Sequence, residues 1–195
     1  MLVASRMTRD PITVTNKTSI DEALKVMRDK KIRRLPVVDE KGKLVGIVAE
    51  KDILYASPSP ATSLSIHEIH YLVSKLTVAE IMTKNVFTVT DDTPLEEAAK
   101  IMADNRIGAL PVLHDGELVG IITETDIFKA FLELLGAREP GVRITMKVPD
   151  GQGMLPLCTE TISKLGGRVL ALVTWGRDEP GDRIVTVRVS GVDQK

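Results

Sequence analysis

The sequence has a single cysteine, few aromatic residues and almost no net charge. Cys158 is the only cysteine among 195 residues, so neither an internal disulfide nor a cysteine-based metal cage can form. Aromatic residues make up 3% of the chain, too few for the stacking platforms of single-strand nucleic-acid binders. The formal charge of -1 comes with no basic stripe, which argues against a dedicated nucleic-acid-binding protein.

Long apolar segments are also absent from the sequence. No apolar stretch approaches the roughly 18 residues of a membrane span, and residues 1–6 contain no apolar signal region. We therefore expect a cytoplasmic protein with no membrane partner. The hydrophobic residues, 43% of the chain, are enough for a folded core, which must consist mainly of aliphatic side chains.

The most informative feature that is present is an internal repeat. Residues 7–40 align without gaps to residues 82–115, and the motif LPV occurs at the same place in both copies. Residues 42–54 then align to residues 116–128, with one residue lost at the turn. The period is longer than that of solenoid repeats, which indicates a duplicated domain rather than a repeat array.

Both copies are predicted to fold with the same order of elements. Residues 12–15 and 87–90 alternate apolar with β-branched polar side chains, as short strands do. Thr18 and Thr93 are the predicted N-caps of a helix, because an acidic residue follows each of them three positions later. Two apolar runs around a turn glycine predict a hairpin, and a second helix follows it. One such β-α-β-β-α unit buries too little surface alone, so we expect two units packed about a pseudo-twofold axis.

The repeated pattern MTxxxxTVxxxTxxxxAxxxMxxxxIxxLPVxxxGxLVGIhxxxDI resembles the cystathionine-β-synthase (CBS) domain, where h is hydrophobic. The tandem arrangement is similar to a CBS pair and covers roughly residues 3–135. The resemblance implies an α/β (α+β) fold with two clefts between the units. It also implies that these clefts bind an adenosine-containing ligand, which is AMP, ADP, ATP or S-adenosylmethionine.

The resemblance implies that ribose and phosphate bind at the last strand-to-helix turn, through the motif [Ser/Thr]-x-x-Asp. A short carboxylate can accept both ribose hydroxyls, while a hydroxyl and the free amides of a helix N-terminus suit a phosphate. The second copy matches with Thr123 and Asp126. The first copy has Ala49 and Asp52, so it keeps the carboxylate and lacks the hydroxyl.

Basic residues just before the LPV strand are expected from the resemblance to reach the phosphate held by the opposite copy. The first copy supplies Arg33 and Arg34, where the second has Gly108 and Ala109. We therefore predict a stronger nucleotide cleft formed by Thr8, Ile12, Thr13, Arg33, Arg34, Ile122, Thr123 and Asp126. A second, weaker cleft without arginines is predicted around Thr83, Thr88 and Asp52, with Ala49, Gly108 and Ala109 nearby.

Between the copies, residues 57–60 predict a loop and residues 64–76 an amphipathic helix. His67 and His70 lie three residues apart there, with Glu68 beside them. Two histidines with one adjacent acid fall short of the usual ligand set of a metal site. We expect no metal there and favour solvated or capping roles.

After residue 141 the pattern changes to a strand, a helix and two further strands. This β-α-β-β order, with Pro-Asp-x-x-Gly after the first strand, is similar to the start of an ACT domain, a small ferredoxin-like module of regulatory proteins. The fragment lacks the usual further helix and strand, so it would expose a sheet edge, and we expect a homodimer. The resemblance implies a small-molecule site near the glycine turn, at Gln152, Gly153 and Met154. The alternative is that the tail only dimerises.

The expected domains are a first CBS unit (1–57), a linker and helix (58–76), a second CBS unit (77–135) and an ACT-like domain (141–195). This order and length resemble the acetoin-utilisation regulatory protein family. We expect a regulatory ligand-sensing protein without a required cofactor, acting on an unknown downstream protein. A structural or partner-binding protein with vestigial nucleotide sites is the alternative. No catalytic residues are expected, because His67, His70 and His114 are scattered and no nucleophile–base pair is visible.

Overall fold

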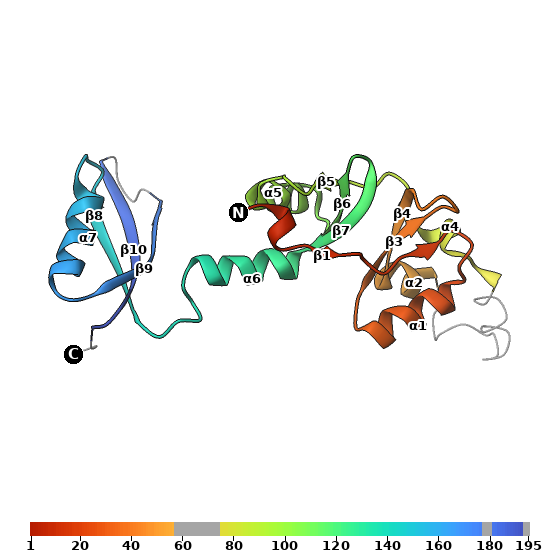
Figure 1. Cartoon of the computed structure of the whole chain (residues 1–195), viewed down its shortest axis with the longest axis horizontal. Coiled ribbons are helices and arrows are strands. Elements are labelled where there is room, and N and C mark those ends of the chain that lie inside the picture. The colour runs from red at the N-terminus through yellow and green to blue at the C-terminus, as the bar shows by residue number, and fades with distance from the viewer. Residues whose placement is uncertain (57–74, 177–180, 193–195) are drawn as a thin grey trace. The chain divides into compact units, whose positions relative to one another are not determined.

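A computed structural model describes residues 1–56, 75–176 and 181–192 (Figure 1). The chain divides into two units, Met1–Ile127 and Phe128–Lys195, and the boundary falls within helix α6. His67, Glu68 and His70 lie outside the described residues, as does most of the predicted helix at 64–76. In the part of the chain that is described, no helix has the length and apolarity needed to cross a membrane.

Both copies in the first unit have the predicted β-α-β-β-α order. The elements of the first copy are η1 (Val3–Ser5), β1 (Thr8–Arg9), β2 (Val14–Thr15), α1 (Ile20–Lys30), β3 (Arg34–Val38), β4 (Leu44–Ala49) and α2 (Glu50–Ala56). Those of the second are α4 (Val78–Ile81), β5 (Val89–Thr90), α5 (Leu95–Asn105), β6 (Ala109–His114), β7 (Glu117–Thr123) and α6 (Glu124–Leu134). In each copy a two-residue strand, β2 or β5, pairs in parallel with the following strand, β3 or β6, which forms an antiparallel hairpin with β4 or β7.

Helices α1 and α5 begin one residue later than the sequence predicts. The N-cap of α1 is Ser19, whose hydroxyl accepts a hydrogen bond from the Glu22 amide, and the N-cap of α5 is Pro94. Thr18 and Thr93 instead accept hydrogen bonds from the amides of Thr15 and Thr90, at 3.1 Å in both copies. The threonines therefore close the turn that precedes each helix, and the prediction of them as N-caps is wrong.

The segment that leads into each copy pairs with the sheet of the other copy. Thr8 of β1 pairs antiparallel with Ile121 of β7, which gives the sheet order β1-β7-β6-β5. In the same way Thr83 forms a bridge to Ile47 of β4, beside the sheet β2-β3-β4. This reciprocal exchange joins the two copies into one unit, as the pseudo-twofold arrangement requires.

Two glycines make the exchange sterically feasible. A β carbon at Gly46 would lie 2.5 Å from the Met82 sulfur, and one at Gly120 would lie 2.5 Å from the Met7 sulfur. Each leading segment thus places a methionine against the bare backbone of the opposite hairpin. The apolar core of the first copy consists of Val14, Ile20, Ala23, Met27, Leu35, Val37, Val48, Ile53 and Val78, of which Val78 comes from the segment that leads into the second copy.

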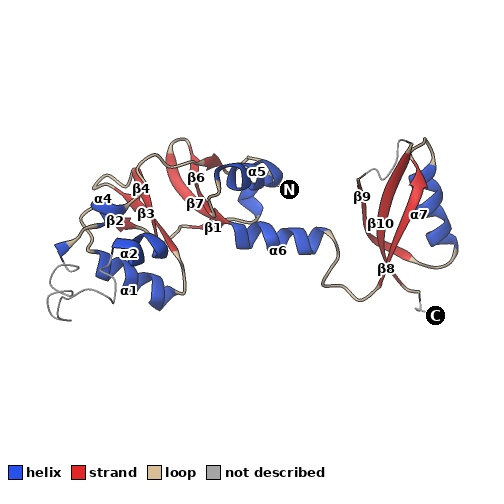
Figure 2. Cartoon of the chain, turned by 180° about the vertical axis from the view of Figure 1, so that it is seen from behind, coloured by secondary structure: helices blue, strands red, loops and turns tan. Residues whose placement is uncertain are grey.

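The tail unit begins with the second half of α6, and its described residues continue into an antiparallel sheet and a further helix (Figure 2). The elements after α6 are β8 (Val142–Pro149), α7 (Met154–Lys164), β9 (Arg168–Trp175) and β10 (Asp182–Ser190). β10 lies in the centre, between β8 and β9. Val185, Val187 and Val189 of β10 are buried, together with Val148, and Met154 and Ile162 of α7 pack against them. The predicted β-α-β-β order is confirmed.

Candidate functional site

A cavity of about 510 Å³ lies where the two copies of the first unit meet. The first copy contributes the start of β3, the end of β4 and the first turns of α2. The second copy contributes Thr83, residues 85–87, residues 106–109 and Glu124. Every residue on the wall belongs to the unit Met1–Ile127. The exchange of leading segments places Thr83 on this wall, because it pairs the chain there with β4.

The carboxylate of Asp52 lies on the cavity wall at the start of α2. Its Oδ2 accepts a hydrogen bond of 2.9 Å from the Ala49 amide, which satisfies one of the free donors at the helix N-terminus. No hydrogen bond to Oδ1 occurs within the described residues. One oxygen therefore holds the turn, and the other can accept a hydrogen bond from a ligand.

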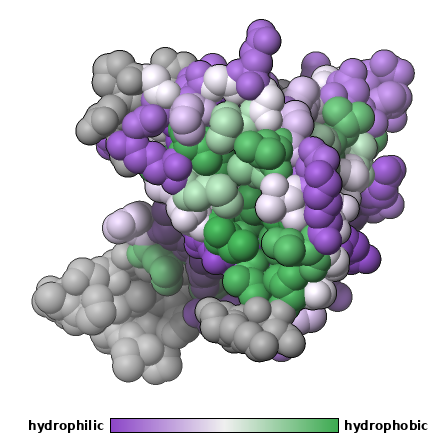
Figure 3. All heavy atoms as spheres, turned by 90° about the vertical axis from the view of Figure 1, so that its left-hand side faces the viewer, coloured by the Kyte–Doolittle hydropathy of each residue, from purple (hydrophilic) through white to green (hydrophobic). Residues whose placement is uncertain are grey.

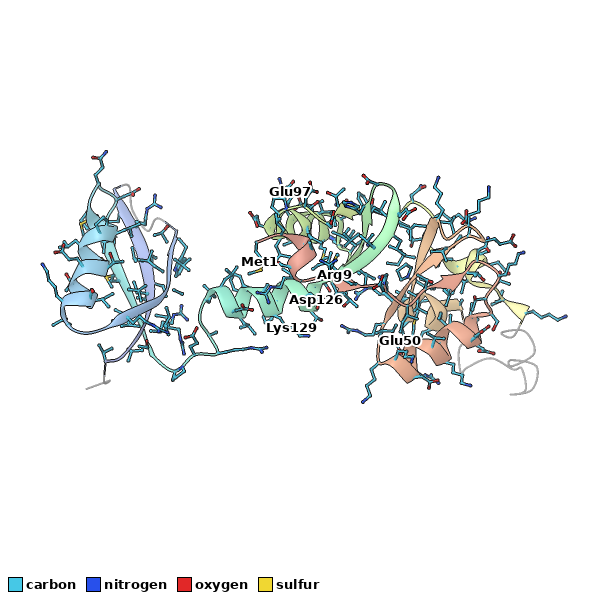
Figure 4. All side chains as sticks on the ribbon, viewed as in Figure 1. Met1, Arg9, Glu50, Glu97, Asp126 and Lys129 are labelled. Carbon is cyan, nitrogen blue, oxygen red and sulfur yellow. The ribbon has the colours of Figure 1, made fainter. Side chains whose placement is uncertain are left out.

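Asp126 occupies the equivalent position at the start of α6 (Figure 4). Its Oδ2 accepts hydrogen bonds from the Thr123 amide at 3.0 Å and the Thr123 hydroxyl at 2.6 Å. The Asp126 amide in turn donates to that hydroxyl at 3.4 Å, so the two residues form a reciprocal N-terminal cap. The Thr123 hydroxyl predicted to bind phosphate thus already has a partner in this structure.

Arg34 reaches across from the first copy to the second. Its Nη2 lies 3.8 Å from Oε2 of Glu124, and a β carbon at Gly108 would lie 2.1 Å from the same nitrogen. The absence of a side chain at position 108 therefore leaves the space that the guanidinium occupies. Burial lowers the pKa of Arg34, and the nearby Arg33 also lowers it, whereas Glu124 and Asp52 raise it.

The arginines lie in a different cleft from the one predicted. Arg33 and Arg34 are on the wall of the cavity that contains Asp52 and Thr83, where the sequence led us to expect no arginine. The physical reason is their place at the start of β3, on the seam that both copies share. Gly108 lies on the same seam and carries no side chain that would block Arg34.

Other predicted residues are distributed between the two clefts. Thr8 pairs with β7, which places the leading segment of the first copy beside the turn that contains Thr123 and Asp126. Ile122 is fully buried, so it offers no exposed surface to a ligand in this structure. Thr88 is half-buried and does not line the cavity. Ile12 is 40% exposed in the segment between β1 and β2.

The cavity contains functional candidates that the sequence prediction missed. Phe87 lines it with 50% of its surface exposed, which is high for an aromatic side chain and makes Phe87 a candidate for stacking on a ligand. Lys51 and Arg106 add two further cations to the wall. A signal for Phe87 was present, since it aligns with Ile12, which was included in the predicted site. No sequence pattern indicates Lys51 and Arg106, because their place on the wall depends on the exchange of leading segments between the two copies.

In the tail unit, the three predicted ligand residues lie around the start of α7. Gly153 is its N-cap and has a φ of 87°, in the left-handed region that favours glycine. Met154 packs against the buried valines of the sheet. Arg183 donates two hydrogen bonds to the Asp150 carboxylate and fixes the loop before the glycine. That carboxylate and its hydrogen bond raise the pKa of Arg183.

The duplicated units, their exchanged segments and the paired strand-to-helix turns define a CBS domain pair. The CBS domain family matches residues 3–59 and 78–133, and the chain belongs to this family. The sequence prediction of a tandem CBS pair is therefore confirmed. The chain spans 94% of one curated relative but only 23% of another, which is a longer enzyme.

Three solved structures show the particular proteins that this chain resembles. A CBS domain pair in complex with 5-methylthioadenosine and S-adenosyl-L-methionine is 36% identical, with a TM-score of 0.57, over 71% of this chain and 98% of that one. The protein CBSX2 in complex with AMP is 34% identical, with a TM-score of 0.56, over 67% and 96%. A proposed acetoin utilization protein from Vibrio cholerae is 33% identical, with a TM-score of 0.58, over 71% and 96%.

Proposed function

We propose that this protein is a regulatory ligand sensor that binds an adenosine-containing ligand in the cavity between its two CBS units. The observation that carries the proposal is the combination of a free carboxylate oxygen, several cations and an exposed aromatic ring in one cavity of about 510 Å³. That volume is within the range of small-molecule sites. Two similar CBS pairs were solved with adenosine ligands, which supports the same ligand class here.

Each part of such a ligand has a matching group on the cavity wall. Oδ1 of Asp52 can accept the ribose hydroxyls, and Phe87 offers a ring face to the base. The wall contains the basic residues Arg33, Arg34, Lys51 and Arg106 and the acidic residues Glu50, Asp52 and Glu124. Because Glu124 already faces Arg34, the remaining cations favour a phosphorylated nucleotide such as AMP, ADP or ATP over a neutral nucleoside.

The cleft with Thr123 and Asp126 stays part of the proposal as a second adenosine site. Thr8, Ile12 and Thr13 would line it from the leading segment of the first copy. If the protein acts as a sensor, the ligand must bind one arrangement of the two CBS copies more tightly than another. A ligand shifts a conformational equilibrium only through such a difference in affinity. We keep the sequence boundaries at residues 57, 76, 135 and 141 as a proposal for the repeated units, whereas the compact units of the structure divide between Ile127 and Phe128.

Calorimetric titration with AMP tests the assignment of the cavity. We compare Asp52→Asn and Arg34→Met with Asp126→Asn, and use Asp21→Asn as the matched control, since Asp21 is an exposed acid in the first turn of α1. Losing a charge-assisted hydrogen bond should weaken AMP binding about tenfold or more in Asp52→Asn and Arg34→Met. Asparagine keeps an oxygen for the cap, so the helix start is preserved.

Two results would overturn this assignment. If AMP, ADP, ATP and S-adenosylmethionine all fail to bind the unmodified protein, the proposed function is wrong. If Asp126→Asn alone weakens binding, the nucleotide occupies the other cleft, as the sequence alone predicted. Melting curves of every variant show whether each protein is folded before its titration is interpreted.

We further propose that the tail is an ACT-like domain through which the protein forms a homodimer. The β-α-β-β order supports this, and so do the exposed leucines on and after α7. Leu155, Leu157 and Leu165 are 37%, 55% and 75% exposed. Figure 3, viewed from the side of the tail unit, shows apolar side chains gathered over a broad area. Light scattering of the unmodified protein and of Leu157→Glu would test the dimer.

A further inference from the structure

The tail unit contains a cavity of about 330 Å³ on the face of its sheet opposite α7. Phe131 and Leu135, one helical turn apart, line it together with Ala137. The remaining wall comes from the three strands. None of Gln152, Gly153 and Met154 lines this cavity, so it is distinct from the ligand site expected near the glycine turn.

Strand register explains why the floor of the cavity is mainly apolar. Directly paired residues of neighbouring strands point to the same face of a sheet. Thr186 of β10 pairs with Val173 of β9, and Ile184 pairs with Trp175, so these side chains face away from α7. The Trp175 indole donates a hydrogen bond of 3.3 Å to the Thr186 hydroxyl. That bond satisfies the polar edge of the indole and leaves its ring available for apolar contact.

Two arginines lie at one end of this floor. Arg188 of β10 pairs directly with Arg143 of β8, and like charges in that position destabilise a sheet. The Arg188 guanidinium donates to the Glu139 carbonyl oxygen, at 3.1 Å from Nε and 2.5 Å from Nη2. The Arg143 guanidinium has no ion pair or hydrogen bond within the described part of the chain. An anion beside Arg143 would relieve this repulsion.

The described wall of the cavity contains no acidic side chain. The ammonium group of an amino acid would therefore lose its water without gaining a carboxylate partner, which is unfavourable. A carboxylate without an ammonium group meets no such penalty. The cavity is at the small end of the range for ligand sites, which limits the ligand to a small molecule.

We propose that this cavity binds a small apolar carboxylate without an amino group, with an aromatic or branched body. The body would contact Trp175, Val173 and Phe131, and the carboxylate would contact Arg143. This site goes beyond the proposed nucleotide function and does not rest on it, because every residue involved belongs to the unit Phe128–Lys195. It would give the protein a second input from a chemically different ligand.

The fluorescence of Trp175 gives a direct test, because it is the only tryptophan in the chain. The full chain is titrated with phenylacetate, with neutral phenylacetamide and with phenylalanine. We expect phenylacetate to change the tryptophan emission saturably. Phenylacetamide and phenylalanine should bind about tenfold more weakly or worse, since one lacks the charge and the other adds an unpaired ammonium group.

Two variants and a control complete the test. Arg143→Met should weaken phenylacetate binding about tenfold and leave phenylacetamide unchanged, whereas Ala171→Leu, which fills the floor, should weaken both. Lys164→Met removes a cation from α7, whose helix packs on the other face of the sheet, and should change neither. Circular dichroism confirms folding. The proposal is overturned if phenylacetate gives no saturable change, if the amide or phenylalanine binds equally well, or if Arg143→Met binds like the unmodified protein.

Discussion

Replacing Gly46 or Gly120 by alanine tests the exchange of leading segments on which the nucleotide cavity depends. At Gly46 the new β carbon would lie 2.5 Å from the Met82 sulfur and 3.1 Å from the Thr83 carbonyl oxygen. At Gly120 it would lie 2.5 Å from the Met7 sulfur and 3.2 Å from the Thr8 carbonyl oxygen. A methionine side chain can turn away, but a backbone oxygen can move only if its segment shifts.

The cost follows from the size of these overlaps. Optimal carbon contacts are about 3.5–4.0 Å, so the sulfur contacts at both sites are far too short. Inserting one methyl group into a packed site costs about 1–3 kcal/mol. For a chain of this size each kcal/mol lowers the melting temperature by about 2–4 °C. Both variants should therefore melt several degrees below the unmodified protein.

The two variants should differ in their effect on nucleotide binding. Gly46→Ala displaces Thr83 and, with it, the wall that contains Phe87, so AMP affinity should fall about tenfold. Gly120→Ala displaces Thr8, which belongs to the other cleft, and should change AMP affinity less. Differential scanning fluorimetry and calorimetric titration measure the two quantities.

Gly151→Ala is the control, because a β carbon there meets no atom within 4 Å. Unchanged melting of both test variants would refute the close approach of each methionine to the opposite hairpin. A large loss of stability in Gly46→Ala without any loss of AMP affinity would show that the segment after Thr83 takes no part in binding.

Two further predictions concern the helix cap and pH. Thr123→Val removes the hydroxyl that caps α6 and should lower the free energy of unfolding by about 1 kcal/mol. Ala49→Thr should add the equivalent cap to α2 and raise the free energy of unfolding. Urea unfolding measures both, and equal stability of Thr123→Val and the unmodified protein would contradict the capping role of Thr123. The hydrogen bond of 2.9 Å between His114 and Asp91 raises the pKa of His114 above its ordinary 6.5 and lowers that of Asp91 below its ordinary 3.8. The pair therefore stabilises the folded protein fully at pH values between these two ordinary pKa values. This stabilisation is lost as the pH rises through the raised pKa of His114 or falls through the lowered pKa of Asp91. His114→Asn should lower the melting temperature slightly at about pH 5.5 and hardly at about pH 9, and an equal loss at both would contradict this account.

The repeat, the order of elements and the family could be predicted from the sequence because each depends on local patterns. The apolar periodicity of α1 and α5 and the LPV hairpins have the same form in both copies. The β-α-β-β order of the tail likewise follows from its local pattern, whereas the pairing of its strands, with a register shift between Arg188 and Val189, was not predicted. The starts of α1 and α5 were predicted one residue early, because a threonine hydroxyl can close a turn as readily as it caps a helix.

The set of residues that line the cavity was harder to predict, because it depends on contacts between segments distant in the sequence. Arg33 and Arg34 were assigned to the Asp126 cleft, although Arg34 extends over Gly108 and lies on the wall with Asp52. No sequence motif indicates that Lys51 and Arg106 line the cavity. Only the exchange that pairs Thr83 with Ile47 shows which loops share a wall.

A crystal structure of this chain grown with AMP tests the central claim most directly. The account predicts that the ribose hydroxyls lie within hydrogen-bond distance of Asp52 Oδ1 and that the phosphate lies beside Arg33 or Arg34. The base should stack on the ring of Phe87. Nucleotide bound only beside Thr123 and Asp126, or at neither turn, would contradict it.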